Sequence, residues 1–233
     1  MTITQTDIAS LRQAIRQLSR PEREELAEWI LNNGDFNAET REAAEKYSSN
    51  PPRRMTVEEY LELDGEPIRY EYIAGQIFAT SSPLLRHELL VTNLGWHIAT
   101  QLRGGPCRVF SSRAAVRLKI LSDDIFYHPD VVVSCEPLTT EVLDQQYLTS
   151  PCIIAEVLSP STEAIDRREK ALNYRHLPSV EEFLLVAPRT MHLTVFRRSE
   201  QWKPRVLTKA DELFESCAVQ VRVALADIYD GLQ

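Results

Sequence analysis

The sequence predicts an α/β fold in which helices flank a mixed central β-sheet, with a helical hairpin ahead of this domain. Three features predict it: short β-branched runs typical of buried strands, one long stretch with the apolar spacing of an amphipathic helix, and a change of pattern near residue 50. We therefore expect a hairpin extension and linker over residues 1–50 and one main domain over residues 51–233.

The hairpin is expected from two short helical patterns. Apolar residues recur at helical spacing from Ile8 to Leu18, and Ser19-Arg20-Pro21-Glu22 then has the form of a capping box with proline in the first turn. Gly34 is placed to end the second helix. Two short helices bury little surface alone, so we expect them to dock a protein partner or to mediate oligomerisation; packing on the main domain is the alternative.

The first half of the main domain predicts a helix, a hairpin and a long helix. Thr56–Tyr60 has the form of a helix start, and the two apolar runs 69–73 and 76–79 flank a turn at Gly75. Leucine and isoleucine recur at helical spacing over 84–103, which predicts an amphipathic helix there.

The second half predicts further strands and one more helix. β-branched and aromatic runs favour strands at 107–120, 130–135, 151–158, 182–187 and 193–197. We expect a helix over 163–176 and edge strands within 213–224.

The charge of the chain limits how it could bind nucleic acid. A net charge of −8 argues against a surface that attracts nucleic acid everywhere, but it permits a local basic groove. Two basic groups could line such a groove, and solvated strand and loop faces are an equally good explanation. These groups are Arg103, Arg108, Arg113, Arg117 and Lys119, and then Arg197, Arg198, Lys203 and Arg205.

The sequence also predicts a cytoplasmic protein without a membrane partner. No apolar run approaches the roughly 20 residues that span a bilayer, and the N-terminus lacks the features of a signal peptide. The four cysteines are scattered without a C-x-x-C pair. Cys135 and Cys152 lie in or beside apolar strands, where we expect them to be reduced and to pack as small apolar residues.

Two acids interrupt apolar strand patterns. Glu156 follows the run Cys152–Ala155, and Asp130 opens the run Val131–Val133. A carboxylate inside a buried strand is costly unless it is protonated, paired or bound to a cation. Neighbouring strands lie about 5 Å apart, so both acids could hold one Mg²⁺ ion, which prefers oxygen ligands. Pairing with an arginine or capping of a loop is the alternative for each acid.

Three further residues are candidates for the same site. Lys170 lies on the predicted helix after the Glu156 strand and could reach a bound water or phosphate, or could form an ordinary surface pair with Asp166. Glu71 could bind a metal or pair across its hairpin. His87 could form a helix-end hydrogen bond or contact a substrate. The sequence has no zinc-type histidine spacing, no dinucleotide or P-loop motif, and no serine-hydrolase elbow.

Three segments together resemble the Uma-type family of putative restriction endonucleases, within the PD-(D/E)XK nuclease superfamily. They are Y-E-Y-I-A-G-Q-I, H-P-D-V-V-V and I-I-A-E-V-L-S-P-S-T-E-A-I-D-R-R-E-K. The resemblance covers about residues 55–200 and is most specific at E-V-L-S-P-S-T. It implies a restriction-endonuclease-like fold, in which a central mixed sheet is flanked by helices.

The resemblance also implies roles for individual residues. Asp130 and Glu156 correspond to the two acids that bind Mg²⁺ or Mn²⁺ in the superfamily. The usual lysine position is Leu158 here, and Lys170 on the following helix is the implied substitute, placed to position or activate water. Glu71 corresponds to an early acid of the family that supports the site.

The function implied is that of a metal-dependent nuclease that hydrolyses phosphodiester bonds in DNA. A homodimer is expected, because cutting both strands of a duplex commonly uses paired active sites. The alternative is a catalytically inactive nuclease-fold protein that acts through interactions in a defence system or mobile element, since fold alone does not establish activity.

Overall fold

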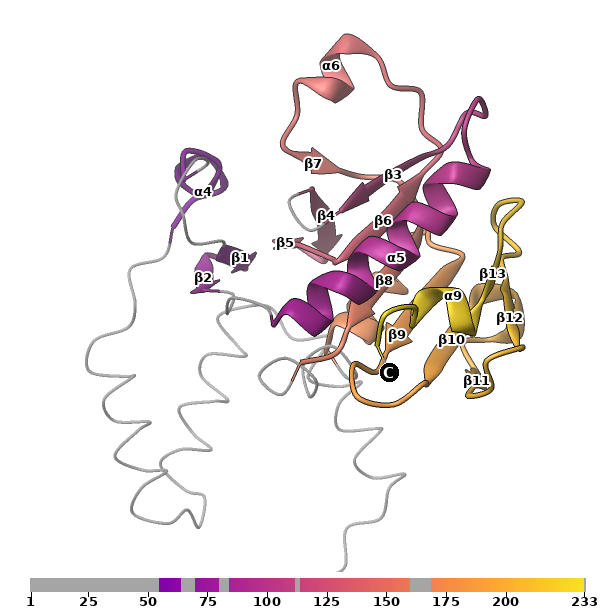
Figure 1. The fold of residues 1–233 in the computed structure, drawn as a ribbon. Coiled ribbons are helices and arrows are strands. Elements are labelled where there is room, and N and C mark those ends of the chain that lie inside the picture. Colours follow the sequence, from indigo (N-terminus) through magenta and orange to yellow (C-terminus); the bar gives the residue numbers. More distant parts are fainter. Residues whose placement is uncertain (1–54, 64–69, 80–83, 112–113, 160–168, 233) are drawn as a thin grey trace, which may run out of the picture. The chain divides into compact units, whose positions relative to one another are not determined.

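The structure is a computed structural model that describes residues 55–63, 70–79, 84–111, 114–159 and 169–232 (Figure 1). All of these residues belong to one compact unit, Arg54–Gln233. The predicted N-terminal hairpin, its linker and the domain boundary at residue 50 lie outside the described residues.

A six-stranded sheet forms the centre of this unit. Strands β8 and β9 run parallel to each other, and all other neighbours in the sheet are antiparallel, which confirms the predicted mixed sheet. In order across the sheet, the strands are β11 (Pro204–Leu207), β10 (Leu193–Arg197), β9 (Glu182–Val186), β8 (Pro151–Val157), β6 (Val131–Ser134) and β3 (Arg108–Ser111).

A five-stranded sheet and a two-stranded sheet accompany the central one. The five-stranded sheet runs β2 (Gln76–Ala79), β1 (Tyr70–Ile73), β5 (Asp123–Tyr127), β4 (Ala115–Ile120) and β7 (Tyr147–Leu148). The two-stranded sheet pairs β12 (Leu213–Glu215) with β13 (Arg222–Ala224). The predicted hairpin at 69–79 is present, but it adds to a second sheet, because β5 pairs with β1.

The two faces of the central sheet are covered by different layers. Helix α5 (Leu85–Gln101) crosses β6 and β8 on one face, where the short helix α9 (Leu225–Ile228) also packs (Figure 1). Side chains alternate along a strand, so Ala155 of β8 faces this helical layer, whereas Ile154 faces the five-stranded sheet. Glu156 has the same parity as Ile154 and lies on the inter-sheet side.

The remaining helices are short. Helix α4 (Val57–Leu61) begins at a capping box formed by Thr56 and Glu59. Helix α6 (Thr140–Leu143), helix α8 (Ala171–Tyr174) and the 3₁₀ turn η2 (Arg198–Glu200) complete the set in the described ranges. Of the helix predicted over 163–176, the residues from 169 onward are described. None of the helices in the described ranges is long and apolar enough to span a bilayer.

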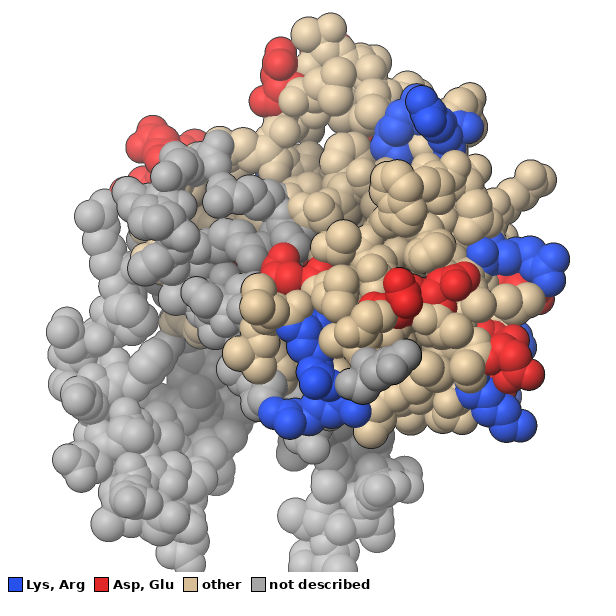
Figure 2. Space-filling view, viewed as in Figure 1, with Lys and Arg blue, Asp and Glu red and all other residues tan. Residues whose placement is uncertain are grey.

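The basic groups noted in the sequence are partly used inside the protein. Arg117 pairs with Asp124, and Arg198 donates hydrogen bonds to backbone carbonyls, including that of Leu177. Figure 2 shows that the lysines and arginines on the face carrying α5 form separate small groups, interspersed with acids. On this face the basic side chains do not form one continuous surface, in keeping with the acidic net charge.

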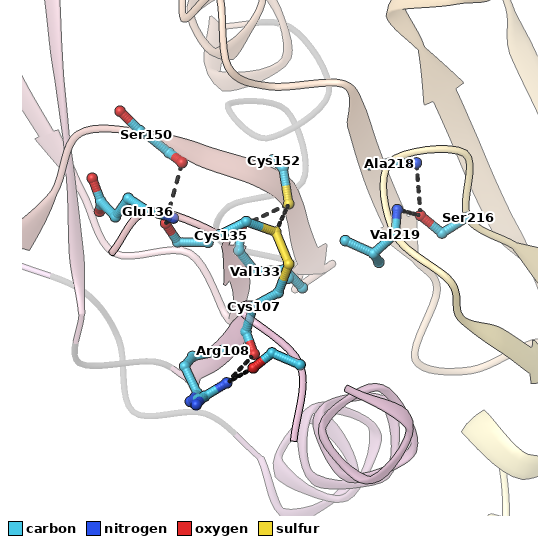
Figure 3. The surroundings of a disulfide bond; sticks show 12 residues. Cys107, Arg108, Val133, Cys135, Glu136, Ser150, Cys152, Ser216, Ala218 and Val219 are labelled. Atoms are coloured by element: carbon cyan, nitrogen blue, oxygen red, sulfur yellow. Dashed lines mark hydrogen bonds between the residues drawn. A yellow bond between two sulfur atoms is a disulfide. The ribbon is translucent and has the colours of Figure 1, made fainter. Parts of the chain in front are cut away.

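Two cysteines form a disulfide bond that the sequence did not predict. Cys107 and Cys135 are linked at the start of β3 and the end of β6 (Figure 3). Arg108 is the Cα partner of Ser134, and one further step in this antiparallel register places Cys107 opposite Cys135. The expectation that Cys135 is reduced and packs as a small apolar residue is therefore wrong, because strand register could not be inferred from cysteine spacing.

A buried ion pair joins β9 and β10. Glu182 is fully buried, and its Oε1 lies 2.8 Å from Nε of Arg197, its Cα partner across the two strands. Arg197 also donates to the carbonyl of Glu215, and Ser216 donates to the second oxygen of Glu182. Burial lowers the pKa of Arg197, but the bonds to Glu182 and Glu200 outweigh it, so the pKa is raised. Through its bonds to Glu215 and Ser216, the ion pair links the C-terminal end of β12 to the central sheet.

Replacing Arg197 with Met should destabilise the protein by about 3–5 kcal/mol, because a buried carboxylate then loses its cation. Arg222→Met is a matched control, since Arg222 pairs with Glu215 at the same 2.8 Å but with side chains 67% and 55% exposed. That change should cost less than about 1 kcal/mol. Urea denaturation measures both losses, and equal losses would contradict the prediction.

Candidate functional site

A buried lysine lies between two buried acids at the junction of the two larger sheets. Lys170 Nζ lies 2.7 Å from Oε1 of Glu71 and 3.4 Å from Oε1 of Glu156. The exposed fractions are 4% for Lys170, 8% for Glu71 and 3% for Glu156. Charged side chains buried this deeply are rare unless they are paired, and here the pairing is direct.

The strands and the helix explain why these three side chains meet. Strand β1 pairs with β5, and Ile73 of β1 packs in the core between the two sheets. Side chains alternate along a strand, so Glu71, two residues before Ile73, lies on the same side. Glu156 points from β8 into the same layer, and Lys170 enters it from the residue preceding α8. The lysine therefore joins one sheet to the other.

Two tyrosines surround this cluster and donate hydrogen bonds to acids. Tyr174 OH lies 2.9 Å from Oε1 of Glu156, and Tyr127 OH lies 2.9 Å from Oε1 of Glu169. The Lys170 ammonium also lies 5.4 Å from the centre of the Tyr127 ring. Burial raises the pKa of Tyr174 well above its usual value, and the charge of Glu156 adds to this. Burial and Glu169 likewise raise the pKa of Tyr127, so both phenols stay neutral donors.

Asp130 lies beside this cluster, across from Glu156. The antiparallel register pairs Val131 with Ala155, and one further step places Asp130 opposite Glu156. Oδ2 of Asp130 accepts a 2.7 Å hydrogen bond from the Val157 amide. This carboxylate is thus fixed to the backbone of the strand that carries Glu156.

His87, in the first turn of α5, holds the same oxygen of Asp130. Its Nε2 lies 3.2 Å from Oδ2, and both side chains are 13% exposed. Burial lowers the pKa of His87, but the hydrogen bond to Asp130 and the charges of Asp130 and Glu88 together raise it by more, so the pKa is raised overall. Of the two alternatives drawn from the sequence, the structure shows His87 in a hydrogen bond at the end of a helix.

The structure therefore brings Glu71, Glu156 and Lys170 into one contact cluster and places Asp130 next to it through the Val157 amide. Phe78 is the Cα partner of Glu71, so the acid is not in an ion pair across its hairpin. The alternative partner of the lysine, Asp166, lies outside the described residues.

Three contacts in this region were not predicted from the sequence. They are the Tyr174–Glu156 bond, the Tyr127–Glu169 bond and the His87–Asp130 pair. Tyr127 ends the short apolar run Ile125–Tyr127 three residues before Asp130, a signal that could have been used. Leu158, the residue that the resemblance places at the lysine position of the superfamily, is 3% exposed in the inter-sheet core, and the cation of the cluster is Lys170.

The donor chemistry of Asp130 and Glu156 fits a magnesium ion. Mg²⁺ is commonly held by one or two carboxylates and keeps its other positions for water and phosphate. The backbone register places Asp130 opposite Glu156, and the bonds from His87 and the Val157 amide both go to Oδ2 of Asp130 rather than to Oδ1. No group of three or more histidine, cysteine or acidic side chains within the described ranges is arranged to hold a metal ion.

The fold places the protein in a recognisable class. The crystal structure of "a putative nuclease" from Anabaena variabilis is similar, with a TM-score of 0.61 and 20% identity over 75% of this chain and 97% of that one. The architecture is thus that of a nuclease-like α/β domain. The chain belongs to the Uma2 family, described as "putative restriction endonuclease", whose model matches residues 57–226. The resemblance found in the sequence is confirmed.

Two relatives from Synechocystis sp. are also similar to this chain. Uncharacterized protein slr1290 is 30% identical over 186 residues, which cover 79% of this chain and 96% of that protein. Uncharacterized protein sll1609 is 30% identical over 133 residues, or 57% of this chain and 74% of that protein.

Replacing His87 with Gln should lower stability more near pH 5.5 than near pH 8.5. Because the folded pKa of His87 is raised, its bond to Asp130 stabilises the protein below the unfolded pKa of about 6.5 and is lost as the pH rises through the folded value. The expected loss at the lower pH is about 1.5–3 kcal/mol, the range for a hydrogen bond to a charged group.

Urea denaturation of both proteins at the two pH values measures this difference. His176→Gln is a control, because His176 is exposed and its backbone amide bonds to Asn173. A loss for His87→Gln that is equal at both pH values, or larger near pH 8.5, would show that the pair carries no such charge.

Proposed function

We propose that this protein is a metal-dependent nuclease that hydrolyses phosphodiester bonds, with DNA as its substrate. The observation that carries the proposal is that Lys170 is buried between Glu71 and Glu156, with Asp130 opposite Glu156 at the start of the neighbouring strand. The family description, "putative restriction endonuclease", supports the same activity.

In this proposal Asp130 and Glu156 hold Mg²⁺ or Mn²⁺. When bound, such an ion stabilises negative charge on the phosphoryl group and makes water more acidic. His87 and the Val157 amide both hold Oδ2 of Asp130, so these two bonds orient the carboxylate without using Oδ1. Tyr174 and Lys170 hold Oε1 of Glu156 in the same manner.

Lys170 supplies the hydrogen-bond donors of the site. Its ammonium charge beside the two carboxylates can position an attacking water or stabilise negative charge on a phosphate oxygen. Glu71 fixes the lysine at 2.7 Å and is a positioning residue. In this arrangement Asp130 and Glu156 bind the ion, and Lys170 contacts the reacting oxygen.

The proposal includes a homodimer that presents two such sites to the two strands of a duplex. The predicted docking role of the N-terminal hairpin remains a separate expectation, because it lies outside the described residues. If the site proves inactive, the protein is instead an interaction protein that retains the nuclease fold.

Cleavage of supercoiled plasmid DNA in Mg²⁺ or Mn²⁺ tests the proposal. We expect nicked and linear products from the wild type, none in excess chelator, and losses of at least about a hundredfold for Asp130→Asn, Glu156→Gln and Lys170→Met. Asp124→Asn is the matched control, because Asp124 also pairs with a cation, is 17% exposed against 13% for Asp130, and lies outside the cluster. It should cleave as the wild type does.

Circular dichroism confirms that each variant is folded before its rate is compared. Equal cleavage by the wild type, Asp130→Asn and Glu156→Gln would assign the activity to a contaminant and remove the proposed site. A folded wild type that cleaves neither duplex nor single-stranded DNA in either metal would favour the interaction protein.

A further inference from the structure

Three cysteines meet where β3, β6 and β8 lie side by side. Cys107 and Cys135 form the disulfide, and Sγ of Cys152 lies 3.7 Å from Sγ of Cys135. Figure 3 shows the three sulfur atoms in a row, with that of Cys135 in the middle. Cys152 carries a free thiol, so an unpaired sulfur touches a disulfide inside the protein.

A β-bulge places Cys152 there. Val133 pairs with Ile153, but the next residue of β6, Ser134, pairs with Pro151, so Cys152 is left without a Cα partner in the ladder. Bulges of this kind re-aim a side chain from its regular direction. The Cys152 thiol donates to the carbonyl of Val133 at 3.4 Å, which holds it over β6 beside Cys135.

We propose that Cys107, Cys135 and Cys152 form a thiol–disulfide exchange site, in which the sulfur of Cys135 is shared and pairs with either neighbour. The Cys152 thiolate attacks Sγ of Cys135, the bond from Cys135 to Cys107 breaks, and Cys107 leaves as a thiolate. Cys152 gives up its proton to solvent and Cys107 takes one up. One disulfide and one thiol remain, so no external oxidant or reductant is needed.

Chain entropy does not choose between the two disulfides. The bond from Cys107 to Cys135 closes a separation of 28 residues, and a bond from Cys135 to Cys152 would close one of 17. In the loop-closure model these lengths differ by only about twofold in the equilibrium constant. Local geometry decides the balance, and both partners of Cys135 are already in place.

Exchange would change which parts of the fold are covalently joined. The present bond attaches the α5–β3 connection and the outer strand β3 to the end of β6. The alternative bond would release Cys107 and would join β6 directly to β8, the strands beside Asp130 and Glu156. For the predicted cytoplasmic localisation this matters, because disulfides there are usually transient and redox-responsive. The inference does not depend on nuclease activity.

The protonation of Cys152 should set the rate of exchange. Burial raises the pKa of Cys152 to about 11, with smaller contributions in the same direction from Glu182 and Glu181. The thiolate is the attacking species, so below pH 11 the rate should rise about tenfold for each pH unit. From pH 7 to pH 9 the expected increase is about a hundredfold.

Differential alkylation tests the exchange in Cys217→Ser protein, which lacks the exposed second free thiol. The oxidised protein is incubated at pH 7 or pH 9, quenched with acid, labelled with N-ethylmaleimide and mapped by peptide mass spectrometry. We expect label on Cys152 alone at first and then also on Cys107, sooner at pH 9. Label that never reaches Cys107 at pH 9 would overturn the proposal. With Cys152→Ser added, Cys107 should stay unlabelled, and label there would equally overturn it.

A second variant tests whether Cys135 can pair with Cys152 when its present partner is absent. Cys107→Ser protein, also carrying Cys217→Ser, is treated with oxidised glutathione, and its fold is checked by circular dichroism. We expect an intramolecular disulfide between Cys135 and Cys152, with release of two molecules of reduced glutathione. Glutathione adducts or unreacted thiols at both positions of the folded protein would show that the two sulfurs do not pair, and would overturn the proposal.

Discussion

The burial of Glu156 on a central strand is the constraint on which the rest of the structure depends. A carboxylate there must be compensated, and Lys170 and Tyr174 both reach the same oxygen of it. Lys170 also contacts Glu71, so the cation that compensates Glu156 is shared with an acid of the other sheet. One electrostatic requirement on β8 thus sets where β1 and α8 must lie.

The two faces of β8 hold the proposed site in different ways. On the inter-sheet side, Glu156 is fixed by an ammonium and a phenol whose hydrogens both point at Oε1. Asp130, across the strand pair, is held by a backbone amide and by His87 from the helical layer. Each acid is therefore oriented by hydrogen bonds from the protein, as supporting bonds orient metal ligands elsewhere.

The sequence was informative where one side chain conflicted with its surroundings. Glu156 in an apolar run pointed to the buried site, and the family motifs added Lys170, whose contacts no spacing rule supplies. The register of the strands could not be inferred from the sequence, which is why the pairing of Cys107 with Cys135 was missed. Strand β5 was missed because it opens with two aspartates and so lacks the apolar alternation of a strand. Without β5, the second sheet could not be foreseen.

The location of Lys170 also bears on how the domain can be divided. Its contacts come from β1 in one sheet and β8 in the other, and the lysine itself precedes a helix between β8 and β9. Neither sheet contains the cluster by itself, so a fragment that includes only one of the two sheets cannot retain it. Any transplantation of the cluster into another protein would have to carry both sheets and the interface between them.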